Sequence, residues 1–127
     1  MASGKYNFIV EQGSQHEVTF VYKDSANAGI SLTGARVRMA VKDHITDTEF
    51  VYRATSDASA DADYLAHFNI PTQSGDDIGK FTLTIPSATT DTMTFNQGVY
   101  DLELVNSDSS VERIIEGKFK VKPQVTE

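Results

Sequence analysis

Apolar and polar residues alternate along much of this chain. The period of two is clearest in six runs, at residues 7–11, 17–23, 36–42, 80–85, 100–104 and 118–122. Weaker alternation occurs at residues 49–53, 64–70 and 111–115. Because such alternation is typical of strands that bury one face, the pattern predicts an all-β protein of about seven to nine antiparallel strands. That many short strands favours a sandwich of two sheets over one open sheet.

The segments between these runs predict one short helix and several loops. Residues 87–94 could form a helical turn capped by Ser87 or Thr89, with Met93 pointing inward. The polar turn at residues 106–110 should join the last two strands as an antiparallel pair. Gly117, inside the final run, predicts a bulge or bend.

Length and composition bound the class of protein. The chain has 127 residues and no cysteine, which predicts a single domain, residues 1–127, that needs no disulfides. No apolar stretch approaches the roughly 20 residues of a membrane-spanning helix, and the first eight residues lack the apolar region of a secretory signal. We therefore expect a protein that is made and kept in a cytoplasm.

The charge balance argues against two classes of partner. The formal net charge is −7, from 18 acidic and 11 basic residues. Non-specific nucleic-acid binding and adhesion to anionic membranes both need a basic surface. The composition thus predicts neither a nucleic-acid nor a membrane partner, and the acidity is most simply a device for solubility.

Candidate chemistry is sparse. His16, His44 and His67 lie far apart and lack the close spacing of metal ligands, so all three are expected on the surface. Asp57 and its neighbours Asp61 and Asp63 could suggest calcium, but the glycine and glutamate of a calcium loop are missing. A solvated, mobile acidic loop over residues 55–63 is the expected alternative. No nucleophile motif, phosphate loop or desolvated carboxylate is present, so we predict no enzyme activity, metal or cofactor.

Interaction candidates come from lysines and tyrosines. Lys118, Lys120 and Lys122 line one side of the last run, with Arg113 nearby. They suit either a protected sheet edge, the favoured interpretation, or a basic stripe that meets an acidic partner.

Tyrosines suggest two further possibilities. Tyr52 and Tyr64 flank the acidic loop and could form a carbohydrate- or receptor-binding surface with it. Tyr100 follows a turn and begins an alternating strand, as the tyrosine corner of immunoglobulin-like sandwiches does, although an ordinary core-edge tyrosine fits the same pattern.

Six different short motifs follow one another from one end of the chain to the other. They are Glu11-Gln12-Gly13, Leu32-Thr33-Gly34, Arg38-Met39, Tyr100-Asp101-Leu102-Glu103, Gly117 and Val125-Thr126. In this order they resemble a family of small structural proteins of tailed bacteriophages, similar to the N-terminal domains of baseplate upper proteins. The acidic stretch at residues 46–75 is longer than is usual in that family.

The resemblance implies an immunoglobulin-like sandwich in the virion, made in the cytoplasm of a host bacterium. It implies a tail, baseplate or fibre-attachment component that docks onto other virion proteins or onto copies of itself. Contacts are expected on residues 6–11 and 117–125 and on the acidic loop. A capsid decoration protein and a carbohydrate- or receptor-binding module remain the alternatives.

Overall fold

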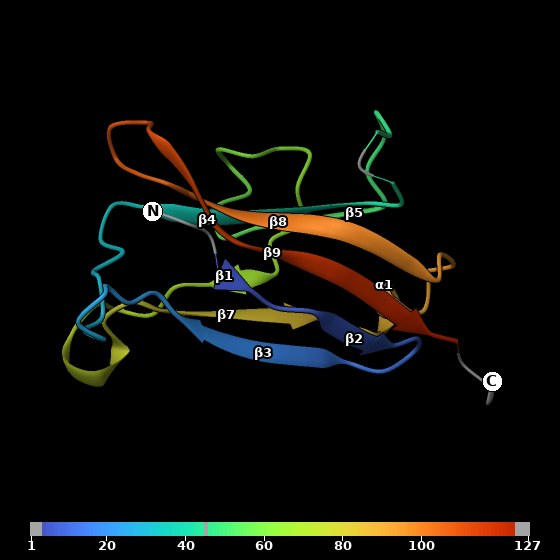
Figure 1. Ribbon diagram of the computed structural model, residues 1–127, viewed down its shortest axis with the longest axis horizontal. Coiled ribbons are helices and arrows are strands. Elements are labelled where there is room, and N and C mark those ends of the chain that lie inside the picture. The colour runs from blue at the N-terminus through green and yellow to red at the C-terminus, as the bar shows by residue number, and fades with distance from the viewer. Residues whose placement is uncertain (1–3, 45, 124–127) are drawn as a thin grey trace.

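The computed structural model describes residues 4–44 and 46–123 and is an all-β sandwich of two sheets (Figure 1). The six-stranded sheet contains β1 (Gly4–Lys5), β9 (Val111–Lys122), β8 (Gln97–Val105), β4 (Arg36–Lys42) and β5 (Tyr52–Thr55) in that order, with β2 (Phe8–Glu11) also paired to β9. The three-stranded sheet has the order β3 (His16–Val21), β7 (Lys80–Ile85) and β6 (Phe68–Asn69). The predicted all-β sandwich is confirmed.

The core lies between the sheets and follows from the alternation. In β4 the residues Val37, Met39 and Val41 are buried, whereas the residues between them are only half-buried. Phe8, Phe81 and Phe119 are fully buried and join the two sheets through aromatic contacts and their neighbours. Burying such large apolar side chains contributes roughly 1.5–3 kcal/mol each, so the inward positions hold the sandwich together.

The N-terminal strands pair with the last strand in parallel. Gly4 and Lys5 of β1 lie opposite Ile115 and Glu116, and β2 lies opposite residues 119–122 of β9. Strand β9 therefore has neighbours on both sides, because β8 pairs with its other edge in antiparallel register. Figure 1 shows β1 and β2 running alongside β9.

Tyr100 and Gly117 fit the N-terminal segment against β9. The Tyr100 hydroxyl donates a hydrogen bond of 2.5 Å to the carbonyl oxygen of Tyr6. A tyrosine-to-backbone tie is thus present, but it reaches the N-terminal segment and not the backbone just before its own strand. A Cβ at position 117 would lie 2.1 Å from the Tyr6 carbonyl oxygen, so only glycine allows this approach. The expected bulge at Gly117 is wrong: the register shift lies at Leu102/Glu103 and their partners.

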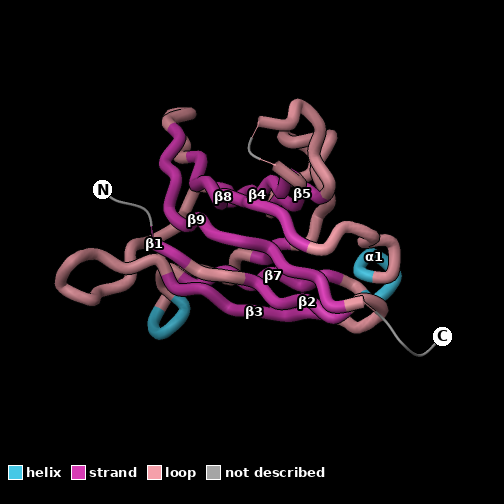
Figure 2. Tube along the Cα trace, turned by 45° about the vertical axis from the view of Figure 1, so that its right-hand side comes forward, coloured by secondary structure: helices cyan, strands magenta, loops and turns pink. Residues whose placement is uncertain are grey.

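The helical segments are single turns at the ends of the sandwich (Figure 2). The turn α1 spans Ser87–Thr90, and the 3₁₀ turn η1 spans Gly75–Asp77. Pro86 occupies the N-cap position of α1 without a side-chain cap, so the capping role predicted for Ser87 or Thr89 is wrong. Met93 is buried, as predicted. Neither helical turn has the length or apolar character to cross a membrane.

We predict that Tyr100→Phe destabilises the fold by about 1 kcal/mol, because it removes the hydrogen bond to Tyr6 and little packing. Denaturant unfolding measures the loss, and amide hydrogen exchange should become faster in Lys5 and Tyr6. Tyr64→Phe is the matched control, with no expected change. Equal effects of the two substitutions would contradict the role of the hydroxyl.

Candidate docking face

Basic side chains concentrate on the outer face of the six-stranded sheet. The register places nine cations at outward positions of its strands: Lys5, Arg36, Arg38, Lys42, Arg53, Arg113, Lys118, Lys120 and Lys122. The same positions hold four acids: Glu11, Asp101, Glu103 and Glu116. We call this set the basic face; nine cations against four acids give it a net charge of +5. The rest of the sequence has two cations and fourteen acids, a net charge of −12.

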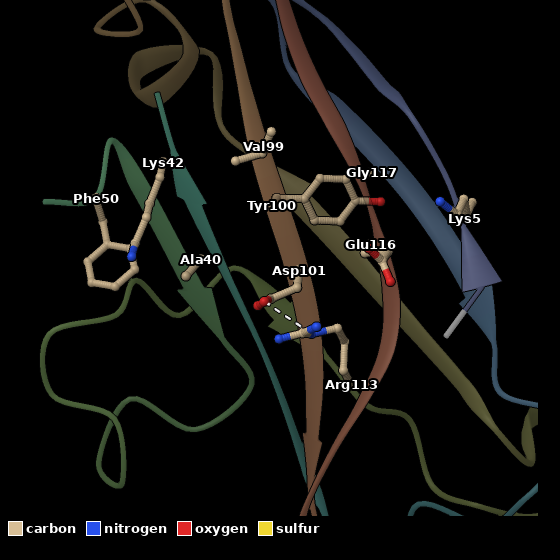
Figure 3. Close-up of a pocket in the computed structure, with 10 residues that line it drawn as sticks. All are labelled: Lys5, Ala40, Lys42, Phe50, Val99, Tyr100, Asp101, Arg113, Glu116 and Gly117. Atoms are coloured by element: carbon tan, nitrogen blue, oxygen red, sulfur yellow. Dashed lines mark ion pairs between the residues drawn. The ribbon is translucent and has the colours of Figure 1, made fainter. Parts of the chain in front are cut away.

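A groove of about 430 Å³ crosses the middle of the basic face (Figure 3). Ala40 and Val99 contribute to its lining, with Phe50 and Lys42 on one side and Lys5 on the other. The Phe50 ring lies 5.0 Å from the Lys42 Nζ and 4.8 Å from the Arg53 Cζ, so two cations stack on one partly exposed ring. The groove therefore offers an aromatic surface between positive charges.

Asp101 lies in this groove and pairs with Arg113 at 3.3 Å (Figure 3). Partial burial raises the pKa of Asp101, and the charges of Glu103 and Glu116 raise it further, while Arg113 and Lys42 oppose the shift. Burial therefore disfavours the charged carboxylate of Asp101, and the neighbouring cations Arg113 and Lys42 stabilise it.

Asp61 anchors the acidic loop to the basic face. Its carboxylate accepts hydrogen bonds of 2.8 Å from the Arg36 Nε and from the Thr55 hydroxyl, and lies 3.4 Å from the Arg38 Nη1. Burial alone would raise the pKa of Asp61, but the hydrogen bonds from Arg36 and Thr55 and the charges of both arginines lower it overall. The prediction that Asp61 belongs to a solvated acidic loop is wrong, because Asp61 is only 7% exposed.

The other two aspartates of the loop do not join Asp61. Asp57 is exposed and accepts hydrogen bonds from the backbone and hydroxyl of Ser59, which lower its pKa. Asp63 is exposed near the edge strand β5. Among residues 4–44 and 46–123, no three acidic or histidine side chains are grouped so that they could hold a metal ion.

The lysine stripe lies on the sheet but not at its edge. Lys118, Lys120 and Lys122 are exposed on the outer side of β9, which is paired on both sides. The favoured edge interpretation is therefore wrong, and the alternative of a basic stripe remains a prediction. None of the three forms an ion pair with another described residue. Arg113 shares their face but lies further along β9, beside Asp101.

The two tyrosines that flank the acidic loop are not equivalent. Tyr52 is 5% exposed, and its hydroxyl lies 2.6 Å from the His67 Nδ1. The expectation that Tyr52 belongs to an exposed aromatic platform is thus wrong. Tyr64 is half-buried, and its ring lies 5.2 Å from the Arg53 Cζ.

Two histidines are less exposed than expected. His16 shares the inward side of β3 with Val18 and Phe20, and its ring packs 5.8 Å from that of Phe8. Its buried Nε2 finds no hydrogen-bond partner in the part of the chain that the structure describes. Burial lowers the pKa of His16 and of His67. The surface positions predicted for these two are wrong, while His44 is exposed as predicted.

Several exposed apolar residues lie near the charges, and of these only Ile9 falls in an expected contact segment, residues 6–11. Ile9 is 58% exposed and lies opposite Lys120. Phe50, Val51 and Leu65 are 39–47% exposed around β5. The sequence indicates an exposed apolar side chain only at Ile9, because this residue interrupts the polar side of an otherwise alternating run. Phe50, Val51 and Leu65 fall in runs whose alternation is weak, and the structure places them outside the named strands.

No protein-family model matches this chain, and a search of curated proteins finds no significant match.

We predict that Asp61→Asn lowers the free energy of unfolding at neutral pH by roughly 1–3 kcal/mol, because it leaves two arginines short of their buried partner. The lowered pKa means that the stabilisation is present above about pH 3.9, the unfolded value, and is lost as the pH falls through the folded value. Denaturant unfolding across this range measures it. Asp63→Asn, on the same loop, is the control, and an equal loss there would contradict the anchor.

We predict that His16→Leu reduces the acid sensitivity of the fold. Burial lowers the pKa of His16, so the folded state favours its neutral imidazole. The contribution of this side chain to the free energy of unfolding is therefore fully present above about pH 6.5 and is lost as the pH falls below that value. Thermal unfolding between about pH 7 and about pH 5 should show a flatter stability curve for the variant. His44→Leu should keep the slope of the natural protein, and the same slope for His16→Leu would refute the assignment.

Proposed function

We propose that this chain is a non-enzymatic structural protein of a tailed-bacteriophage virion, a tail, baseplate or fibre-attachment component that acts by docking onto proteins. The observation that carries the docking role is the segregation of charge: nine of eleven cations lie on one sheet face of an acidic protein. Opposite charges on facing surfaces steer association and select the partner. A charge pattern of this kind therefore favours a surface for recognition.

The strand order supports an immunoglobulin-like classification. When β3 to β9 are taken in chain order as strands B, C, C′, D, E, F and G, the three-stranded sheet becomes B-E-D and the larger sheet contains G-F-C-C′. Immunoglobulin-like sandwiches use these two groupings. Tyr100, near the start of the strand that corresponds to F, also carries the backbone hydrogen bond of a tyrosine corner in an altered form.

The motifs shared with phage structural proteins occupy positions where the fold needs them. Gly13 and Gly34 have φ values of 84° and 77°, which side-chain-bearing residues rarely adopt. Leu32 is buried, and Gly117 admits the N-terminal segment. These structural roles support the proposal that this chain has the same fold as the phage proteins that it resembles. The virion assignment is tested by the experiment below. Val125 and Thr126, the last motif, lie outside the described residues.

The location within the particle can be tested on purified phage particles. An antibody raised against the recombinant chain, coupled to gold, is applied to intact particles and viewed by electron microscopy. We expect label on the tail or baseplate. Mass spectrometry of the same particles provides a second measurement that does not need an exposed epitope.

Each outcome decides between the candidate functions. Label over the head would replace the tail assignment with capsid decoration. A protein that is abundant in infected cells but absent from purified particles by both measurements would overturn the virion assignment.

A further inference from the structure

The two edges of the six-stranded sheet each expose apolar residues, and most of the charged residues beside them are lysines at one edge and acids at the other. One edge is formed by β1 and β2 beside β9, and the other by β5. We call Ile9, on the edge strand β2, together with Lys118, Lys120 and Lys122 of the neighbouring strand β9, the basic edge. Ile9 is 58% exposed, more than any other large apolar residue that the structure describes as exposed, and it lies directly opposite Lys120 in the register. The basic edge is thus an exposed apolar side chain with three lysines on the adjacent strand, and Glu11 of β2 lies opposite one of them, Lys122.

The β5 edge combines exposed apolar residues with acids. Phe50, Val51 and Leu65 line a shallow groove there together with Asp63, and we call these four residues the acidic edge. Two further exposed acids are close in the chain to residues that line the groove: Glu49 precedes Phe50, and Asp91 lies between Thr89 and Thr92. Arg53, a cation in the lining, is held over the rings of Phe50 and Tyr64.

We propose that the acidic edge of one copy of this chain docks onto the basic edge of a second copy. The inference rests on the proposed docking function and names its partner. Ile9 would be covered by the apolar groove residues Val51 and Leu65, and the lysines would face Asp63, Glu49 and Asp91. Desolvated apolar residues at the centre of a contact with charges around them are the usual anatomy of a protein interface.

A contact between two different edges is heterologous. A two-fold contact between two basic edges would bring both sets of three lysines together, which opposes association. Because each copy has one edge of each kind, a second copy leaves both ends of the pair free for further copies. Such contacts build rings if the rotation closes and filaments if it does not.

Sedimentation velocity at low ionic strength, over a series of protein concentrations, tests the proposal. We expect the natural chain to associate beyond a dimer and to dissociate as salt is added. Lys118→Glu with Lys120→Glu should raise the dissociation constant roughly tenfold or more, because two attractions become repulsions. The double substitution Lys23→Glu with Lys80→Glu, away from both edges, is the matched control and should leave association unchanged.

A mixing experiment tests the direction of the contact. The first variant carries Lys118→Glu, Lys120→Glu and Lys122→Glu, and the second carries Glu49→Gln, Asp63→Asn and Leu65→Asn. Each variant alone should remain monomeric, because each lacks one of the two edges. A one-to-one mixture should form a heterodimer and nothing larger, because only one intact edge of each kind is present in the pair. Circular dichroism confirms that both variants are folded.

Four outcomes would overturn the proposal. The first two are a natural chain that stays monomeric at every concentration and a control variant that associates as weakly as the basic-edge variant. The other two are a one-to-one mixture that forms no heterodimer and a mixture that forms assemblies larger than a heterodimer. Retention of a duplex DNA probe by a monomeric natural chain, lost in the basic-edge variant, would reassign the face to nucleic acid. Self-association of a protein that both gold labelling and mass spectrometry find absent from purified particles would keep this contact and remove the virion assignment. Presence in the particles without self-association would do the reverse.

Discussion

The structure depends on the parallel pairing of the N-terminal strands with β9. This pairing turns the last strand from an edge into a central strand, and it needs close contact between two segments more than 90 residues apart. Gly117 provides the space, the Tyr100 hydroxyl binds the Tyr6 carbonyl oxygen, and the Asn7 Oδ1 accepts a 3.0 Å hydrogen bond from the Lys118 backbone. Together these contacts fix which residues of β9 face the core.

The charge pattern follows from this pairing. Once β9 is central, Phe119 and Val121 must point into the core, so Lys118, Lys120 and Lys122 must point outward beside Ile9. The strand also brings β1 and its Lys5 onto the same face. The basic face is therefore a product of register, and it concentrates cations that are spread over most of the sequence.

The acidic loop shows how an ion pair can organise a surface. Asp61 lies over Thr55 and between two arginines of β4, and it ties residues 56–65 to the outer face. The tie leaves Asp63 and Leu65 exposed next to β5. Composition alone describes this loop as acidic and solvated. In the structure, its buried Asp61 holds the loop on the sheet, and its exposed residues Asp63 and Leu65 form a surface next to β5.

The sequence by itself determined the strands, the two-sheet architecture and the inward residues, because alternation with a period of two reports directly which side of a strand is buried. It also indicated that residues 106–110 form the turn between the last two strands, since turn chemistry is local. Only the tertiary structure decided that β9 is central, that Asp61 is buried, that His16 faces inward and is half-buried, and that Tyr52 is covered. Those outcomes depend on which distant segments become neighbours, and the alternation of a single strand contains no information about its partners.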